Sequence, residues 1–421
     1  MRQPKIFTTI QSYSWPLFLA DLLAGITVAM VALPLSLAIA IASGADPAKG
    51  LVTAIVAGFL ISLLGGSRVQ IGGPTGAFIV VVFGVIAQHG YDGLVLATFM
   101  AGLILLVAGF FRAGRLIAFV PEAVVNGFTI GIGVIIATSQ VQDFLGLRLE
   151  NPPADFLEKV PALLGAANTV SVAAVLIALV TLVLIVGLRR LAPRFPGLIV
   201  AVGVGSALVV FLSLPVDTLG SRFGALPSQL PWPTLPDLSP SRIRELLPSA
   251  FVIAFLAAVE SLLSAMVADR MIGGSHRPNA ELSAQGAANI ASALFGGLPA
   301  TGAIARTATN VKAGGKTPVA GIVHAMVILL VMLLAAPLAG YLAMPALAAL
   351  LMVTAWNMTE PHKWRGYVKA PRGDVFLLLL TLVLTVVVDL TVAIGVGVTV
   401  GLALRLLRRG REDSEWSPPD R

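Results

Sequence analysis

The sequence contains no cysteine and very little charge. Of its 421 residues, 12% are charged and 57% are hydrophobic, whereas a soluble domain carries about 25% charged residues. A chain of this length with so few charges cannot cover a water-facing surface, so we expect a lipid bilayer to solvate much of it. The absence of cysteine excludes disulfides, thiolate metal sites and cysteine nucleophiles. The four histidines are scattered without ligand-like spacing, so no metal site or cofactor is predicted.

Apolar runs bounded by charged residues or by proline and glycine clusters predict an all-α polytopic membrane protein. The fourteen runs lie at 22–43, 50–64, 75–88, 93–111, 121–141, 170–188, 196–214, 247–268, 281–295, 303–311, 317–337, 343–356, 374–388 and 390–407. A spanning helix needs roughly 17–25 residues. The runs at 50–64, 75–88, 281–295 and 303–311 fall short of this length, which is typical of helices that stop inside a membrane and line a cavity.

The basic residues indicate how these segments are oriented. With the N-terminus in the cytoplasm, 21 of the 28 lysine and arginine residues fall on the cytoplasmic side, six fall outside and Arg306 falls within a span. This distribution follows the positive-inside rule. We therefore expect a multi-pass protein of the plasma (inner) membrane with both termini in the cytoplasm. The net charge of +7 then reflects orientation, and no nucleic-acid partner is expected.

Two stretches of the sequence resemble each other and indicate an internal repeat. Residues 62–66 (SLLGG) followed by 73–77 (GPTGA) match residues 293–297 (ALFGG) followed by 299–303 (PATGA). Each pair opens a short span, the third or the tenth, and the odd number of spans between them inverts the second copy in the membrane. Inverted repeats with broken helices in matching positions point to the binding site of a transporter. Two half-helices that start near the midplane from opposite sides would direct free N–H groups and partial positive charges at one another, which favours an anion.

Arg306 lies in the first turn of the tenth span, three residues after Ala303. An arginine at mid-bilayer costs about 2.5–3.5 kcal/mol on insertion scales, so it persists mainly where it faces a cavity or a partner. Its guanidinium would add a full positive charge and a planar fork suited to carboxylate or oxyanion oxygens. The alternative is a structural arginine that snorkels or pairs internally, for example with Glu260. His324, in the eleventh span, is interpreted as a packing histidine with satisfied hydrogen bonds.

Glu260 is the only charged residue between Glu245 and Asp269, in the middle of the eighth span. Desolvation favours the neutral form of a buried carboxyl group, so this side chain could take up and lose a proton near neutral pH. That property suits proton coupling. A sodium ion is the alternative, because Ser261 and Ser264 could supply two further oxygen ligands.

The chain resembles the membrane domain of the sulfate permease (SulP) family of anion transporters. The matching stretches are Gly66-Ser67-Arg68 with Gly73-Pro74-Thr75, Asn126-Gly127-Phe128 through Gln140, and Glu260-Ser261 through Glu281, Gly286, Asn289, Phe295-Gly296-Gly297, Pro299-Ala300-Thr301-Gly302, Arg306 and Asn310. The resemblance covers nearly the whole chain. It implies fourteen transmembrane segments in two inverted repeats of seven, as in uracil permeases, with short half-helices at segments 3 and 10.

The resemblance also implies a domain organisation. Residues 1–16 would be a cytoplasmic N-terminus, 17–407 the transmembrane transport domain and 408–421 a short cytoplasmic tail. Within the transport domain, a mobile core (22–111 and 247–337) would work against a gate (121–214 and 343–407) that forms a homodimer. Family members usually continue into a cytoplasmic STAS domain, which we do not expect in this sequence because it stops shortly after segment 14.

The substrate of the family sits between the facing starts of segments 3 and 10, next to segments 1 and 8. The implied substrate-binding residues are Leu35, Ile39, Thr75, Gly76, Ala77, Phe78, Gly302, Ala303, Ile304, Ala305 and Arg306, and the implied coupling residue is Glu260. Family substrates include sulfate, bicarbonate, chloride, oxalate and C4-dicarboxylates. In this sequence Leu35 and Ile39 replace a polar and an aromatic residue of the family pattern. The less polar pocket favours a carboxylate with a carbon body over sulfate or bicarbonate.

Secondary active transport of a small anion is therefore the predicted function. We expect coupling to protons and alternating access of the core against the gate. A sodium-coupled symporter and an anion channel of the same fold are the alternatives, and a nucleobase transporter would not need the cation of Arg306. The sequence has neither an H-E-x-x-H nor a G-x-S-x-G motif, so an enzyme is not expected.

Overall fold

The computed structural model describes residues 3–114, 121–149, 153, 156–192, 196–388 and 390–408. Its long helices account for all the apolar runs of the sequence. In the first half they are α2 (Trp15–Ala42), α3 (Pro47–Leu64), α4 (Ile79–Phe110), α5 (Glu122–Leu145), α7 (Val172–Leu191) and α8 (Gly197–Phe211). In the second half they are α10 (Pro240–Ile272), α11 (Pro278–Leu294), α12 (Ile304–Lys312), α13 (Val319–Ala339), α14 (Met344–Met358), α16 (Arg372–Val387) and α17 (Leu390–Arg408). The predicted tail beyond Arg408 lies outside the described residues.

Short helices occupy the connections between these elements. They are α1 (Lys5–Thr9), η1 (Ile10–Ser12), α6 (Phe156–Gly165), η4 (Ala167–Thr169), α9 (Leu219–Phe223), η5 (Pro361–Lys363) and α15 (Trp364–Lys369). In the described part of the chain, seven helices are long and apolar enough to cross a membrane by themselves. The remaining predicted crossings are shorter helices or halves of a kinked one.

The helix α4 carries two predicted spans, 75–88 and 93–111. It breaks at Gly90, where φ is 71°, a left-handed conformation that glycine adopts without strain. The 3-10 helix η2 (Gly76–Phe78) leads directly into α4, so segment 3 runs from η2 only as far as this break. The tenth span is α12, which is nine residues long. Both short half-helices are therefore present at the predicted positions.

The runs at 50–64 and 281–295 are longer helices than predicted. The helix α3 has 18 residues because it begins at Pro47, with the Asp46 carboxylate accepting a hydrogen bond from the Ala48 N–H. The helix α11 has 17 residues and also begins with a proline, Pro278. Proline suits the first helical position because its missing N–H would have no partner there. The helix α3 is long and apolar enough to cross a membrane, so the prediction that it stops inside the membrane is wrong. For α11 the short span stays a prediction.

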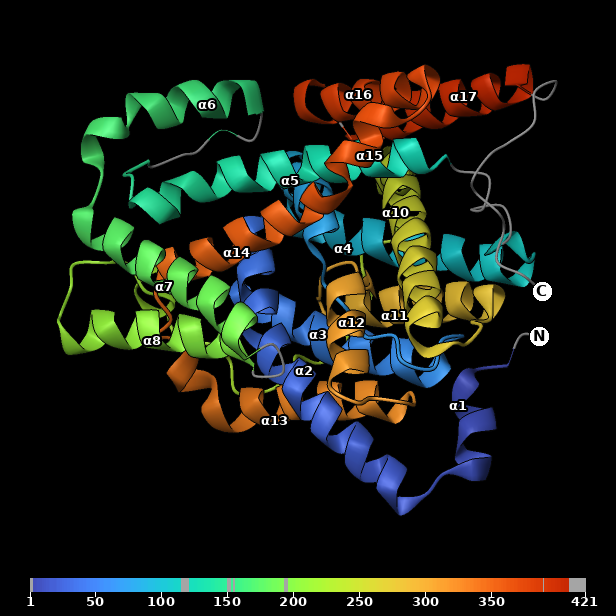
Figure 1. Cartoon of the computed structure of the whole chain (residues 1–421), viewed down its shortest axis with the longest axis horizontal. Helices are drawn as coiled ribbons and strands as arrows, with labels where there is room; N and C mark the ends of the chain where they lie inside the picture. Colours follow the sequence, from blue (N-terminus) through green and yellow to red (C-terminus); the bar gives the residue numbers. More distant parts are fainter. Residues whose placement is uncertain are drawn as a thin grey trace.

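The helices pack in two groups (Figure 1). A core group consists of α2, α3, α4, α10, α11, α12 and α13, and a gate group of α5, α7, α8, α14, α16 and α17. The groups meet mainly along α2, which contacts α8 and α14. The predicted division into a mobile core (22–111 and 247–337) and a gate (121–214 and 343–407) stays a prediction. In Figure 1, α1 and the C-terminal end of α17 lie toward the same side, the right.

The two halves of the core group meet in a short antiparallel pairing. The strand β1 (Gly72–Gly73) pairs with β2 (Thr301–Gly302), so that Gly72 lies opposite Gly302. The Ala303 N–H extends the ladder by donating to the Ile71 carbonyl oxygen at 2.8 Å. Irregular backbone within a membrane must find its hydrogen-bond partners inside the protein. The pairing meets this requirement and lays the starts of segments 3 and 10 side by side.

The buried carboxylate of Asp21 on α2 holds the connection between α12 and α13. It accepts hydrogen bonds from the backbone N–H groups of Lys316 (2.8 Å) and Thr317 (3.1 Å), and from the Thr317 hydroxyl. The Tyr13 hydroxyl also donates to it, at 3.1 Å. Burial, together with the negative charge of Asp21, raises the pKa of Tyr13 to about 12, so this hydroxyl remains a donor at neutral pH. The exit of the half-helix α12 is thereby fixed to α2.

The helices α4 and α11 approach each other through a pair of glycines. A Cβ atom added at Gly102 would lie 2.8 Å from the Gly286 carbonyl oxygen, and one added at Gly286 would lie 2.8 Å from the Gly102 carbonyl oxygen. Small residues at such crossings let two backbones pack closely, which is typical of membrane helices.

Replacing Gly286 with alanine should therefore destabilise the fold. The added methyl group forces two backbones apart, an overpacking that costs about 1–3 kcal/mol. Thermal melting of the detergent-purified protein measures the effect. The matched control is Gly203→Ala in α8, where nothing lies within 4 Å and alanine favours the helix. Equal melting temperatures for the two variants would show that the close approach does not limit stability.

Candidate functional site

Arg306 lies in the first turn of α12 and is 1% exposed. Its Nη2 donates to the Ser36 hydroxyl at 3.3 Å and to the Pro74 carbonyl oxygen at 2.9 Å. Its Nε and Nη1 have no hydrogen-bond partner among the described residues. Glycine at position 73 makes room for the guanidinium, since a Cβ there would overlap Nη1. A buried positive charge with unused donors is thus held at the start of the half-helix.

Glu260 on α10 contacts the start of segment 3, next to the residue that Arg306 binds. Its Oε2 accepts a hydrogen bond from the Thr75 hydroxyl at 2.8 Å. The two charges form no ion pair with each other, contrary to the pairing considered from the sequence. Arg306 binds Pro74 and Glu260 binds Thr75, so the two charges hold adjacent residues at the start of segment 3 from separate sides.

Both half-helices begin without a side-chain cap. The residues at their N-caps are Thr75 for η2 and Ala303 for α12, and neither side chain accepts a hydrogen bond from the helix it precedes. The α12 start is also open, because Ile304 is 41% exposed and Ala305 is exposed as well. Free N–H groups at a helix N-terminus carry partial positive charge and bind anions. Next to Arg306, the two starts can therefore receive a small anion.

Apolar side chains from α2 and segment 3 surround these helix starts. Leu35, Ile39, Ala77 and Phe78 are all buried, with 2–9% exposure. The α2 residue that bonds to the guanidinium is Ser36, which the sequence reasoning did not select. A signal for it was available, because it is the only polar residue next to the predicted Leu35.

The two predicted site glycines face different surroundings. A Cβ at Gly302 would overlap the Gln70 amide, which itself donates from Nε2 to the Ser261 carbonyl and hydroxyl oxygens, both at 3.2 Å. A Cβ at Gly76 would lie 3.2 Å from the Met358 sulfur of α14 and 3.5 Å from Ile136 of α5. Gly302 is therefore packed into the core group, and Gly76 faces the gate group. Substrate binding at Gly76 and Gly302 stays a prediction.

The fully buried carboxylate of Glu281 supports the site from behind. It accepts hydrogen bonds from the backbone N–H groups of Gly66 (2.9 Å) and Ser67 (3.3 Å), from the Ser261 hydroxyl (3.0 Å) and from the Gln285 amide (2.9 Å). These contacts hold the connection between α3 and β1 on α10 and α11. The sequence marks Glu281 as a charged residue in a span, but its partners lie up to 215 positions away along the chain.

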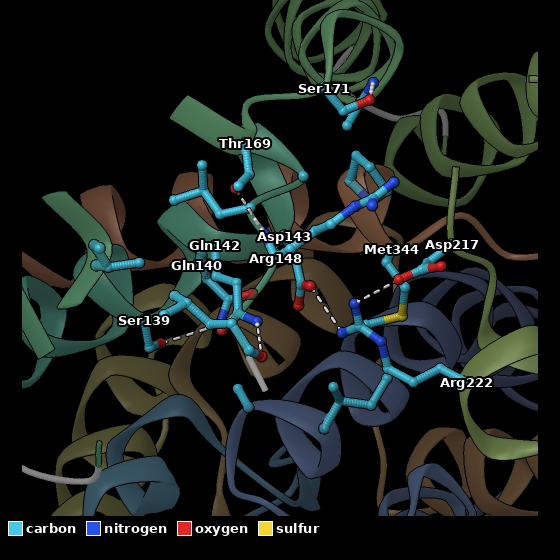
Figure 2. Close-up of a pocket in the computed structure, with 18 of the residues that line it drawn as sticks. Ser139, Gln140, Gln142, Asp143, Arg148, Thr169, Ser171, Asp217, Arg222 and Met344 are labelled. Atoms are coloured by element: carbon cyan, nitrogen blue, oxygen red, sulfur yellow. Dashed lines mark hydrogen bonds and ion pairs between the residues drawn. The ribbon is translucent and has the colours of Figure 1, made fainter. Parts of the chain in front are cut away.

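A separate cavity of about 1100 Å³ lies between the two helix groups (Figure 2), on the side that the charge distribution predicts to be external. Figure 2 shows Arg222 between Asp143 and Asp217, with nitrogen–oxygen distances of 2.8 and 3.0 Å. The charge of this arginine is thus balanced by acidic neighbours. No predicted substrate-binding residue lines the cavity, so it is distinct from the site around Arg306.

Comparisons with known proteins match most of the chain. Residues 18–381 match the model of the sulfate permease family. The putative sulfate transporter YvdB of Bacillus subtilis is 45% identical over 88% of this chain and 70% of its own length. The bicarbonate transporter BicA of Picosynechococcus is 32% identical over 86% of this chain and 66% of its own length.

A solved structure agrees with these sequence matches. The transmembrane domain of a cyanobacterial bicarbonate transporter BicA superposes with a TM-score of 0.81 at 32% identity, covering 90% of this chain and 98% of that domain. The predicted fold, an all-α polytopic membrane protein with fourteen segments in two inverted repeats, is confirmed.

Replacing Gly302 with alanine should lower the melting temperature because the new methyl group displaces the Gln70 amide. Shortening that neighbour in the double variant Gly302→Ala/Gln70→Ala should recover part of the loss. Gly76→Ala serves as the matched control, since its nearest neighbour is the flexible end of Met358. Thermal melting of the four proteins, wild type included, tests this. A double variant no more stable than Gly302→Ala would disprove the steric explanation.

Proposed function

The chain belongs to the sulfate permease family, and on this premise we propose that it is a secondary active transporter of a small anion. The observation that carries the proposal is the buried Arg306 guanidinium, whose Nε and Nη1 have no partner among the described residues. Burying a charge is costly unless it is paired and hydrogen-bonded. An anion at the adjoining helix starts supplies both the opposite charge and the missing acceptors.

The proposed binding site combines three elements of the core group. The starts of segment 3 (Thr75, Gly76, Ala77 and Phe78) and of segment 10 (Ala303, Ile304 and Ala305) line the site and supply backbone N–H groups. The N–H groups of Phe78 and Ala303 are excepted, because they donate to the Thr75 and Ile71 carbonyl oxygens. Arg306 supplies the charge, and Ser36 together with the Pro74 carbonyl orients it. Leu35 and Ile39 supply an apolar wall. Gly302 would position the start of segment 10 through its backbone pairing in β2. A side chain at this position would overlap the Gln70 amide.

The apolar wall favours a carboxylate with a carbon body, such as a dicarboxylate, as the substrate. Burying the carbon atoms of such a molecule against Leu35 and Ile39 is favourable, and the planar guanidinium pairs with its carboxylate oxygens. Sulfate and bicarbonate are the alternatives, since one relative is named a putative sulfate transporter and another a bicarbonate transporter. Competition of each anion against labelled dicarboxylate uptake in proteoliposomes distinguishes the three.

Alternating access would move the core group against the gate group. Gly76 packs against Met358, Ile136 and Thr354 of the gate group, so this contact would have to open and reform in each cycle. A channel of the same fold is the alternative, and single-channel currents far above carrier turnover would support it. Residence in the plasma (inner) membrane, cytoplasmic termini and a homodimer through the gate also belong to this proposal.

Glu260 is the proposed coupling group, and a proton is the proposed coupling ion. Its carboxylate has no cationic partner in the described part of the chain, so protonation would remove an unpaired buried charge. A sodium ion needs several oxygen ligands. The two serines considered for that role are engaged elsewhere: Ser261 donates to Glu281, and Ser264 shares a hydrogen bond with Thr307.

Replacing Arg306 with alanine should weaken anion binding by roughly ten- to a hundredfold, the range expected for losing a charged hydrogen-bond donor. Lysine should restore part of the affinity, because it keeps the charge and loses the planar fork. Isothermal titration calorimetry on purified protein measures both. The control is Arg244→Ala, an exposed arginine at the start of α10. Unchanged affinity in a folded Arg306→Ala variant would remove Arg306 from the site.

Replacing Glu260 with glutamine should abolish uptake driven by an inward proton gradient and leave anion binding intact, because glutamine mimics the protonated acid. Uptake into proteoliposomes with imposed proton or sodium gradients measures this. The control is Glu245→Gln on the same helix, whose exposed carboxylate pairs with His89 at 3.0 Å. Sodium-dependent uptake that ignores the proton gradient would contradict the assignment. Full proton-driven accumulation by Glu260→Gln would place the coupling group elsewhere.

A further inference from the structure

His324 on α13 is fully buried, and neither ring nitrogen has a hydrogen-bond partner among the described residues. The sequence predicted a packing histidine with satisfied hydrogen bonds, but no described residue supplies them. Nearly all buried polar side chains in proteins are paired with protein or with ordered water. The proposed transport mechanism gives this histidine no role, so its unpaired nitrogens need a separate explanation.

A second unpaired group lies on the facing helix α3, one helical turn along its contact with α13. The hydroxyl of Ser62 on α3 is buried and has no partner in the described structure. It lies against Gly321, one helical turn before His324, where a Cβ would overlap the hydroxyl oxygen. At Gly58, one turn before Ser62, a Cβ would lie 3.1 Å from the Gly72 carbonyl oxygen and 3.8 Å from the His324 ring. Facing turns of α3 and α13 thus bring both unpaired groups beside β1.

The chemistry of these groups favours a neutral ligand with both donors and acceptors. A neutral imidazole offers one donor and one acceptor, and a hydroxyl offers one donor and two acceptors. The Arg306 guanidinium lies against Gly73 of β1, next to Gly72, whose carbonyl oxygen faces Gly58 and the His324 ring. A cation bound here would be repelled by this second positive charge. Water fits these conditions, because a buried water molecule typically makes about three hydrogen bonds to otherwise unpaired polar groups.

We propose that His324 and Ser62 hold ordered water behind the anion site and that this water supports β1. The strand continues into Pro74 and Thr75, which Arg306 and Glu260 bind, so its position sets where the anion sits. His324 is then a positioning residue that acts through water, and it makes no contact with the substrate. The effect on transport rests on the proposed function, whereas the hydration itself does not.

Variants of His324 separate a hydrated site from a dry one. His324→Leu should lower the melting temperature and raise the KM for the transported anion about tenfold with kcat nearly unchanged. His324→Asn retains a donor and an acceptor and should recover most of the KM. Ser62→Ala should shift both quantities in the same direction as His324→Leu.

The opposite results would overturn the proposal. If His324→Leu is more stable than the wild type with unchanged KM, the nitrogens are unpaired in a dry core, where removing them is favourable. If His324→Leu and His324→Asn behave alike, only side-chain size matters. Should His324→Leu fail to fold, Ser62→Ala decides, since an unchanged or higher melting temperature contradicts bound water. The melting measurements need no substrate, so they test the hydration even if Arg306→Ala shows that the transport proposal is wrong.

Discussion

Broken helices inside a lipid bilayer leave backbone groups that water cannot reach, and this chain satisfies them by pairing its two breaks with each other. The pairing of β1 with β2, extended by the bond from Ala303 to Ile71, joins the two inverted repeats at one place. This pairing places the two half-helix starts side by side. The positions of Thr75 and Arg306, and with them the proposed anion site, depend on it together with the side-chain bonds between the repeats.

Three charged side chains from the second repeat hold the corresponding part of the first. Arg306 binds the Pro74 carbonyl, Glu260 binds the Thr75 hydroxyl, and Glu281 binds the backbone before β1. Each charge is buried or half-buried, and each is bonded to neutral groups rather than to an opposite charge. In the proposed mechanism, a bound anion and a proton on Glu260 would act on neighbouring residues of one segment. That adjacency would offer a physical route for the proposed coupling.

The two repeats are similar in sequence around their breaks, yet their glycines serve different purposes. Gly302 accommodates the Gln70 amide inside the core group, whereas Gly76 accommodates Met358 of the gate group. The difference arises because the gate group approaches the start of segment 3, while α10 and its neighbours cover β2. A pseudo-symmetric fold thus presents one of its half-helix starts to the surface along which the two groups would slide.

The sequence by itself determined the number of segments, the two half-helices, and that Arg306 and Glu260 are charges inside the spans. Apolar runs and isolated charges are local features of the sequence. Because a charge in lipid is costly, an isolated charge in an apolar run can be identified without a structure. The apolar runs predicted α3 and α11 to be shorter than they are, because the prolines at which these helices begin lie outside the runs. The tertiary structure alone decided that Ser36 holds Arg306 across 270 positions, that Ser261 and Ser264 are engaged away from Glu260, and that His324 is unpaired. Such partners come together only when the chain folds, because hydrogen bonding between distant residues leaves no periodic trace in the sequence.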